Sequence, residues 1–198
     1  MKSVLISTRP KLVEKICHKI GEDETGKAIY EKRIEVRKSA PQEVPFKAYI
    51  YCTIGNGVKG DYLVPSGIQC GKVIGWFICD KVEIVNAKCS DYGIDLFYHD
   101  CLTNGCLTER EIEKYFNVPE DRDLRAMKGN GYVWNISDLE IYDKPRELSE
   151  FSRPCSYSGL CFSCKRTSFK KDGNLLCNTK ITRPPKSWMH VEDLGEEK

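Results

Sequence analysis

Short strand-like segments recur along the whole chain and limit the folds that it can adopt. These segments are rich in β-branched or aromatic residues, or they alternate between apolar and polar side chains. They comprise residues 2–7, 32–38, 47–53, 72–79, 81–85, 132–142 and 187–191. Many short strands with few helices predict an α+β protein whose core is a small, mostly antiparallel β-barrel with helices packed outside it.

The first predicted helix spans residues 10–20. Pro10 suits the first turn of a helix, and Gly21 is a residue that commonly follows a helix end. Apolar residues recur between them at helical spacing, so one face of this helix is expected to cover the sheet.

Two more short helices are predicted later in the chain. Thr108 and Glu111 have the spacing of a capping box, in which each side chain bonds the backbone of the other, so a helix is expected to begin there. Apolar residues follow on one face of that helix. Residues 143–151 are predicted to form the other helix, opened by Pro145.

The length of 198 residues favours one main domain with a small appendage. We predict a barrel over residues 1–153, an insertion over residues 154–183, and a final strand with an acidic tail over residues 184–198. The mean hydropathy of -0.46 is that of a globular protein, and no apolar run is long enough for a membrane span. Residues 1–7 are too short for a secretory signal, so a cytoplasmic location is expected.

Four cysteines near the C-terminal end have the spacing of a metal site. Cys161 and Cys164 are separated by two residues, Cys155 precedes them, and Cys177 follows after a longer loop. A two-residue gap lets two thiolates face one ion, and later cysteines complete a tetrahedron. This pattern predicts one structural zinc ion, because four protein ligands leave no open position. Free thiols in a surface loop and iron–sulfur ligation are the alternatives.

The other cysteines carry weaker predictions. The chain has 11 cysteines, an odd number that favours thiols and metal thiolates over a disulfide framework. Cys89, His99, Cys101 and Cys106 form a looser group that would serve a second metal ion or simple packing, and the sequence does not decide between these. Core thiols are predicted at Cys52, Cys70 and Cys79.

Two motifs carry a family resemblance. The segment ISTRPK at residues 6–11 is followed by a predicted helix and then by KRIEVRK at residues 32–38. This combination resembles the ASCH family of the PUA-like superfold, whose signature is a lysine, a glutamate three positions later and an arginine two further on. Here these are Lys32, Glu35 and Arg37. Later segments look like the remaining barrel strands of that family: residues 49–53, 71–75, 131–134 and 183–188.

The resemblance implies a β-barrel with a cleft between the sheet and the first helix, and ligands that are RNA, nucleotides or modified bases. The cysteine loop would be an insertion before the closing strand. Related proteins occur in bacteriophage and bacterial genomes. Two features depart from the family: Gly26 lies six positions before Lys32 instead of in a tight turn, and Glu35 stands where enzymes of the family that hydrolyse acetylated cytidine place a threonine nucleophile.

The alternation in residues 32–38 gives this site its chemistry. It predicts that Arg33, Glu35 and Arg37 point the same way, so that two guanidinium groups bind phosphate oxygens and a carboxylate accepts from the amine of a base. The alternative is a purely structural role, in which these charges lie on an exposed strand face and form cross-strand ion pairs. If the protein is an enzyme, Lys32 and Glu35 are the predicted acid/base pair.

Aromatic residues near these strands are candidates for base stacking or for the core. They are Tyr49, Tyr51, Trp76 and Trp134. Residues 165–186 hold seven basic residues and one acidic residue, a charge of +6 that would add an electrostatic surface for nucleic acid.

The leading hypothesis is therefore an RNA- or nucleotide-binding module that holds a structural zinc ion and binds its ligand through Lys32, Arg33, Glu35 and Arg37. The alternatives are a hydrolase acting on a modified nucleoside in the same cleft and a phage accessory protein that binds a protein partner through the zinc loop. The sequence does not settle whether the protein is an enzyme.

Overall fold

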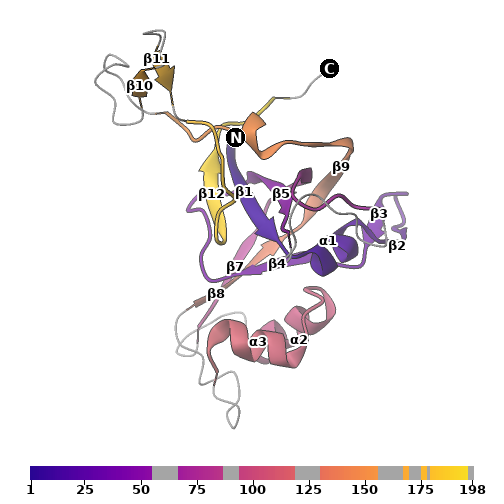
Figure 1. The fold of residues 1–198 in the computed structure, drawn as a ribbon. Helices are drawn as coiled ribbons and strands as arrows, with labels where there is room; N and C mark the ends of the chain where they lie inside the picture. The colour runs from indigo at the N-terminus through magenta and orange to yellow at the C-terminus, as the bar shows by residue number, and fades with distance from the viewer. Residues whose placement is uncertain are drawn as a thin grey trace.

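Two β-sheets form the body of the molecule in the computed structural model (Figure 1). The structure describes residues 1–54, 67–86, 94–118, 130–155, 167–169, 175–177 and 179–195. The larger sheet has the strand order β12-β1-β5-β6-β9, in which only the β1–β5 pair is parallel among the described strands. Its strands are β1 (Lys2–Thr8), β5 (Phe46–Cys52), β6 (Val73–Cys79), β9 (Ser137–Arg146) and β12 (Trp188–Val191).

The smaller sheet is antiparallel and has the order β4-β8-β7. Its strands are β4 (Ile34–Arg37), β7 (Val82–Asn86) and β8 (Asn130–Asn135). The chain enters the smaller sheet twice: once for β4, between β1 and β5, and again for β7 and β8, between β6 and β9. The predicted α+β class with a core of short, mostly antiparallel strands is confirmed.

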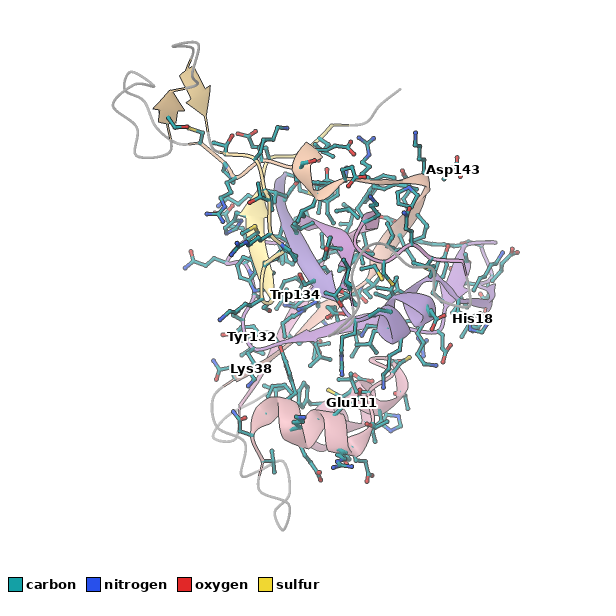
Figure 2. All side chains as sticks on the ribbon, viewed as in Figure 1. His18, Lys38, Glu111, Tyr132, Trp134 and Asp143 are labelled. Carbon is teal, nitrogen blue, oxygen red and sulfur yellow. The ribbon has the colours of Figure 1, made fainter. Side chains whose placement is uncertain are left out.

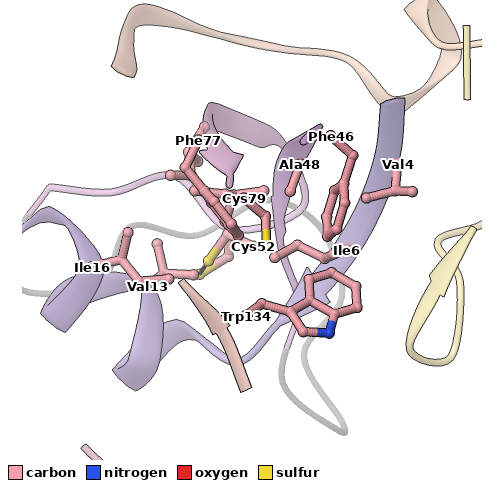
Figure 3. Close-up of a cluster of buried hydrophobic side chains, with 13 residues drawn as sticks. Val4, Ile6, Val13, Ile16, Phe46, Ala48, Cys52, Phe77, Cys79 and Trp134 are labelled. Atoms are coloured by element: carbon pink, nitrogen blue, oxygen red, sulfur yellow. Dashed lines mark hydrogen bonds between the residues drawn. The ribbon is translucent and has the colours of Figure 1, made fainter. Parts of the chain in front are cut away.

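Helix α1 (Pro10–Cys17) covers the space between the two sheets, where the main core lies. Val13 and Ile16 of this helix face the buried thiol of Cys52, and Trp134 of β8 fills the other side (Figure 3). The Trp134 ring packs edge-on against Phe46, with 5.0 Å between ring centroids. The predicted core thiols are confirmed, because Cys52, Cys70 and Cys79 are all fully buried.

Helices α2 (Ile94–Thr103) and α3 (Glu109–Phe116) pack on the smaller sheet (Figure 1). The predicted capping box of α3 is present, since Thr108 Oγ1 accepts from the Glu111 amide and the Glu111 carboxylate accepts from the Thr108 amide. Ile112 and Phe116 are buried against this sheet, as predicted for an amphipathic helix. In the described part of the chain, no helix has the length and apolar character that a membrane crossing requires.

The outer face of the larger sheet is covered by the C-terminal part of the chain. The 3₁₀ turn η2 (Leu148–Glu150) and Phe151 lie against Tyr49 of β5. The Tyr49 hydroxyl also bonds the Asp193 carboxylate and the Leu194 amide. Tyr49 is therefore part of the core.

Three predicted elements differ from those observed. Helix α1 ends at Cys17, because Lys19–Glu22 forms β2, which pairs with β3 (Ala28–Tyr30). The predicted strand at residues 132–142 is two strands, β8 and β9, each in a different sheet. The helix predicted over residues 143–151 is wrong, since β9 continues to Arg146 and pairs there with Val73. Helix α2 was not predicted.

A small hairpin of β10 (Thr167–Phe169) and β11 (Leu175–Cys177) lies apart from both sheets in Figure 1. It belongs to the predicted insertion over residues 154–183. The division of the chain at residues 153 and 183 stays a prediction.

Candidate functional site

A cavity of about 480 Å³ lies where the start of α1, strand β4 and helix α3 meet. Figure 2 shows Glu111 in this region, between α1 and α3. The cavity is lined by polar and charged side chains and by a few apolar ones: Ser7, Thr8, Arg9, Leu12, Lys32, Glu35, Val36, Arg37, Lys38, Leu107, Glu111, Lys114, Tyr115 and Lys186. Its volume is within the range of small-molecule sites, about 300–1,000 Å³.

Three charged residues form the floor of the cavity. Lys32, Glu35 and Arg37 are only 1%, 4% and 6% exposed. The Glu35 carboxylate lies between the two cations, with Oε2 at 3.3 Å from Lys32 Nζ and Oε1 at 2.8 Å from Arg37 Nη2. The three side chains therefore form one buried network with a net charge of +1.

Each of the two cations donates to two backbone carbonyl groups. Lys32 Nζ donates to the carbonyls of Ile34 at 2.6 Å and of Gly105 at 2.9 Å. Arg37 donates to the carbonyls of Ser187 at 3.2 Å and of Ser7 at 3.0 Å. Since Ser7 belongs to β1 and Ser187 precedes β12, Arg37 ties β4 of the smaller sheet to one edge of the larger sheet.

Two atoms of the network have no hydrogen-bond partner among the described residues. These are Arg37 Nε, a donor, and Glu35 Oε2, an acceptor that has only the ion pair with Lys32. Buried polar atoms without a partner are uncommon, because each loses its hydration without compensation. Here both residues line a cavity, so a ligand bound there would lie close to these two buried atoms.

Glu35 is ionised in this setting. Burial by itself would raise the pKa of the carboxyl group, but the positive charges of Lys32 and Arg37 outweigh burial and hold the pKa below its usual value. The floor therefore presents a carboxylate acceptor rather than a carboxylic acid.

The rim of the cavity is basic. Arg9, Lys38, Lys114 and Lys186 are exposed and line it. The Lys38 ammonium lies 5.0 Å from the centre of the Tyr115 ring, whose face forms part of the wall. Mobile cations around a rigid polar floor suit an anionic ligand with a polar head.

The fold is similar to known structures. No protein-family model matches the sequence, and no curated protein is significantly similar to it. A crystal structure of ASCH from Zymomonas mobilis superposes with a TM-score of 0.52 at 14% sequence identity, covering 96% of this chain and 88% of that one. The structure of a serine-to-alanine mutant of the same protein superposes with a TM-score of 0.53 at 14% sequence identity, covering 96% of this chain and 89% of that one.

The chain has the ASCH fold. The resemblance found in the sequence is therefore confirmed at the level of the fold. Its three signature residues, Lys32, Glu35 and Arg37, come together in one cavity between the first helix and a sheet.

Within this ASCH fold Arg33 lies elsewhere than predicted. Its guanidinium bonds Asn104 Oδ1, and it lines a second cavity, of about 620 Å³, on the other side of Lys32. The reason is that β4 begins only at Ile34, so the two-residue alternation does not extend back to Arg33. The exposed-ladder alternative is wrong as well, because Glu35 and Arg37 are buried.

The aromatic residues mostly serve the core. Trp134, Tyr49 and Tyr51 are at most 6% exposed, so they cannot stack on a ligand. Trp76 is half-buried in the second cavity, with Lys47 Nζ 4.2 Å from the centre of its ring. Tyr115 is the aromatic side chain at the main cavity, and it was not predicted as a site residue from the sequence. Its position on the amphipathic face of α3 was the available signal.

Two of the four predicted zinc ligands lie outside the described residues. Cys161 and Cys164 belong to that part, Cys155 is exposed, and only the backbone of Cys177 is described, in β11. No cluster of three metal-ligating side chains occurs among the residues that the structure does describe. The zinc site therefore stays a prediction.

The three described members of the looser group, His99, Cys101 and Cys106, do not form a metal-binding cluster. Cys101 is fully buried among apolar side chains, where burial raises the pKa of its thiol to about 12. Cys106 Sγ lies 3.5 Å from the carbonyl of Glu31, and His99 is exposed on α2. Cys89 lies outside the described residues. The packing interpretation therefore holds for Cys101.

Proposed function

We propose that the protein binds RNA or a nucleotide in the cavity between α1, β4 and α3. The observation that carries this proposal is the combination of a buried acceptor and a buried donor, Glu35 Oε2 and Arg37 Nε, at the floor of a cavity with a basic rim. The fold similarity supports an ASCH-type cleft at this place. The proposal concerns binding and assigns no reaction.

The floor would receive the base of one nucleotide. A carboxylate oxygen accepts from the exocyclic amine of a base, and a guanidinium N–H donates to a ring nitrogen or carbonyl oxygen. Adenine and cytosine carry an amine next to an acceptor on one edge, whereas uracil does not. Glu35 and Arg37 therefore favour a base with an amine.

The rim would receive phosphate groups. Arg9, Lys38, Lys114 and Lys186 are exposed, so their ammonium and guanidinium groups can move onto a phosphate without a large desolvation cost. This division of roles differs from the sequence hypothesis, in which Arg33 and Arg37 bound the phosphate. Arg37 now has a role at the floor, since its Nη atoms are already engaged by the protein.

Lys186→Ala and Lys114→Ala test this proposal. Binding of a labelled single-stranded RNA octamer is measured by fluorescence anisotropy over a series of salt concentrations. Each phosphate that is no longer neutralised should weaken binding and make the slope of log K against log[salt] less negative by about 0.7. Lys144→Ala is the matched control, because Lys144 is exposed on β9 and does not line the cavity. Binding by both rim variants that equals the control would overturn the proposal.

The hydrolase alternative receives no support from the geometry. Lys32, one member of the predicted acid/base pair, donates to two backbone carbonyl groups and forms an ion pair with Glu35, so its ammonium group is already engaged by the protein. The protein-partner alternative depends on the zinc loop, which lies mostly outside the described residues.

We also propose that Cys155, Cys161, Cys164 and Cys177 hold a structural zinc ion. Backbone pairing at the base of the loop supports this ligand set. Ser152 and Lys180 form an antiparallel bridge, and continuing that register along both segments would place Cys155 opposite Cys177. Cys177 also pairs with Thr167, which follows Cys164 by three residues. A tetrahedral site would require Cys177 to lie near the earlier cysteines, and these two pairings support that arrangement.

A further inference from the structure

Two basic residues at the start of α1 are paired with a carboxylate from another helix. Glu111 Oε1 lies 2.8 Å from Lys11 Nζ and 3.2 Å from Arg9 Nη2. Its other oxygen accepts from the amide and the hydroxyl of Thr108, each at 3.0 Å. One carboxylate thus serves the N-terminal ends of both α1 and α3.

The start of α1 needs an anion at this place. Its N-cap, Arg9, makes no side-chain capping bond, and the first turn contains no acidic residue. Arg9 and Lys11 instead place two positive charges at the positive end of the helix dipole, which is unfavourable unless a negative charge lies close by. Glu111 supplies that charge from α3.

The same carboxylate faces the proposed ligand cavity. The cavity is lined by six basic residues and two acidic ones, and Glu35 and Glu111 are those two. Arg37, which is only 6% exposed, also lines this cavity, and its buried Nε has no hydrogen-bond partner among the described residues. This unused donor is independent of the helix ends and itself indicates a ligand.

We propose that Glu111 is an internal substitute for a ligand phosphate. Its carboxylate holds Arg9 and Lys11 at the start of α1, and a phosphate of the bound nucleotide replaces it there. Glu111 therefore sets the affinity of the cavity for phosphorylated ligands. This inference depends on the proposed nucleotide function of the same cavity.

Glu111 can perform this exchange as an anion over the whole neutral range. Burial would raise the pKa of its carboxyl group, but hydrogen bonds from Lys11 and Thr108 and the charge of Arg9 lower the pKa to about 2. The exchange is therefore one anion for another, without uptake of a proton, and the effect of Glu111 on binding is expected to be independent of pH between about 5 and 8.

Glu111→Gln tests the proposal, with Glu109→Gln as the matched control. The single carbonyl oxygen of glutamine can keep the capping bond of α3 to Thr108, while its NH2 group can no longer hold Arg9 and Lys11. Glu109 lies in the same first turn, is exposed and does not line the cavity. Glu111→Gln should melt at a somewhat lower temperature than Glu109→Gln, because it leaves Arg9 and Lys11 without their carboxylate. Glu111→Gln should bind the RNA octamer about three- to tenfold more tightly near 0.1 M salt, with a slope of log K against log[salt] steeper by about 0.7 for each additional phosphate that the protein neutralises.

Two probes separate this inference from the proposed function. If wild-type protein binds the octamer but Glu111→Gln binds no more tightly than Glu109→Gln, the inference is overturned and the function stands. If no variant binds the octamer, but Glu111→Gln alone binds inorganic pyrophosphate, the inference stands for an anion site and the proposal of nucleic-acid binding is overturned. If Glu111→Gln binds neither probe better than the control, Glu111 has only its capping role.

Discussion

Replacing Glu35 with glutamine is expected to be one of the most destabilising single changes in the chain. The substitution leaves Lys32 and Arg37, 1% and 6% exposed, without the carboxylate between them. Breaking a buried ion pair in this way costs about 3–5 kcal/mol, because a buried charge is left uncompensated. The free energy of unfolding of a whole domain is about 5–15 kcal/mol, so the variant would lose a large share of its stability.

Urea unfolding followed by tryptophan fluorescence measures this loss, since Trp134 is fully buried in the core. The free energy of unfolding of a small protein falls by about 2 kcal/mol for each molar of urea. The urea concentration at the unfolding midpoint should therefore fall by roughly 1.5–2.5 M. Glu31→Gln is the control. Glu31 pairs with Lys15 and His18, but these partners are substantially exposed, so this change should cost less than about 1 kcal/mol.

The pH dependence gives a second readout of Glu35→Gln. The pKa of Glu35 is lower in the folded protein than in the unfolded chain, so its stabilising contribution is fully present above the unfolded value of about 4.3. The contribution disappears as the pH falls through the lower, folded pKa. The difference between wild type and variant should therefore be constant from about pH 6 to 8 and should narrow in acid.

The sign of the stability change caused by a second substitution, Lys32→Met, completes the test. Lys32→Met should destabilise the wild-type protein, because it leaves the Glu35–Arg37 pair with one cation fewer. In the Glu35→Gln background the same change should stabilise, because it removes a buried charge that has lost its partner. A Glu35→Gln variant within about 1 kcal/mol of Glu31→Gln at neutral pH, or a Lys32→Met effect of the same sign in both backgrounds, would refute the reasoning.

Two further predictions concern other parts of the chain. Gly75→Ala should lower the melting temperature by several degrees, because a Cβ at Gly75 would lie 2.2 Å from the carbonyl oxygen of Glu140 in β9; Gly21→Ala, with no atom within 4 Å, should change it little. Cys164→Ser should lower the zinc content measured by mass spectrometry from about one ion per chain toward zero, whereas Cys106→Ser should leave it unchanged; a full zinc content in Cys164→Ser contradicts the predicted ligand set.

The sequence predicted those strands whose pairing follows from their own pattern. β1, β5, β6 and β7 carry β-branched and aromatic residues over their whole length, and each lies within one or two residues of its predicted bounds. The end of α1 could not be predicted in this way. Ile20 continues the helical spacing of the preceding apolar residues, but residues 19–22 pair with a strand that Asp23 and Gly26 bring back in a tight turn, and this contact decides their structure.

The candidate site shows the same division between local and tertiary information. The signature Lys32, Glu35 and Arg37 could be found from the sequence, because its spacing is local. The position of Arg33 could not, since the backbone amides of Arg33 and Ile34 both bond to the carbonyl of Asn104, which comes from the connection after α2. The capping box likewise predicted the bond of Glu111 to Thr108, but its contact with α1 depends on how the helices pack.

The hydrogen bonds of the buried network explain why its two cations, Lys32 and Arg37, are not expected to bind the phosphate groups of a ligand. A cation that binds a ligand must exchange water for the ligand, and Lys32 and most of Arg37 have already exchanged water for carbonyl groups and for Glu35. Their charges keep Glu35 ionised and fix its position, so the atoms left over at the floor can discriminate by hydrogen bonding rather than by charge. Non-specific attraction for phosphate then belongs to the exposed rim, where Glu111 opposes it. Affinity and selectivity would therefore respond to different residues: rim substitutions should change the salt dependence for every RNA alike, while changes at Glu35 should alter which base is preferred.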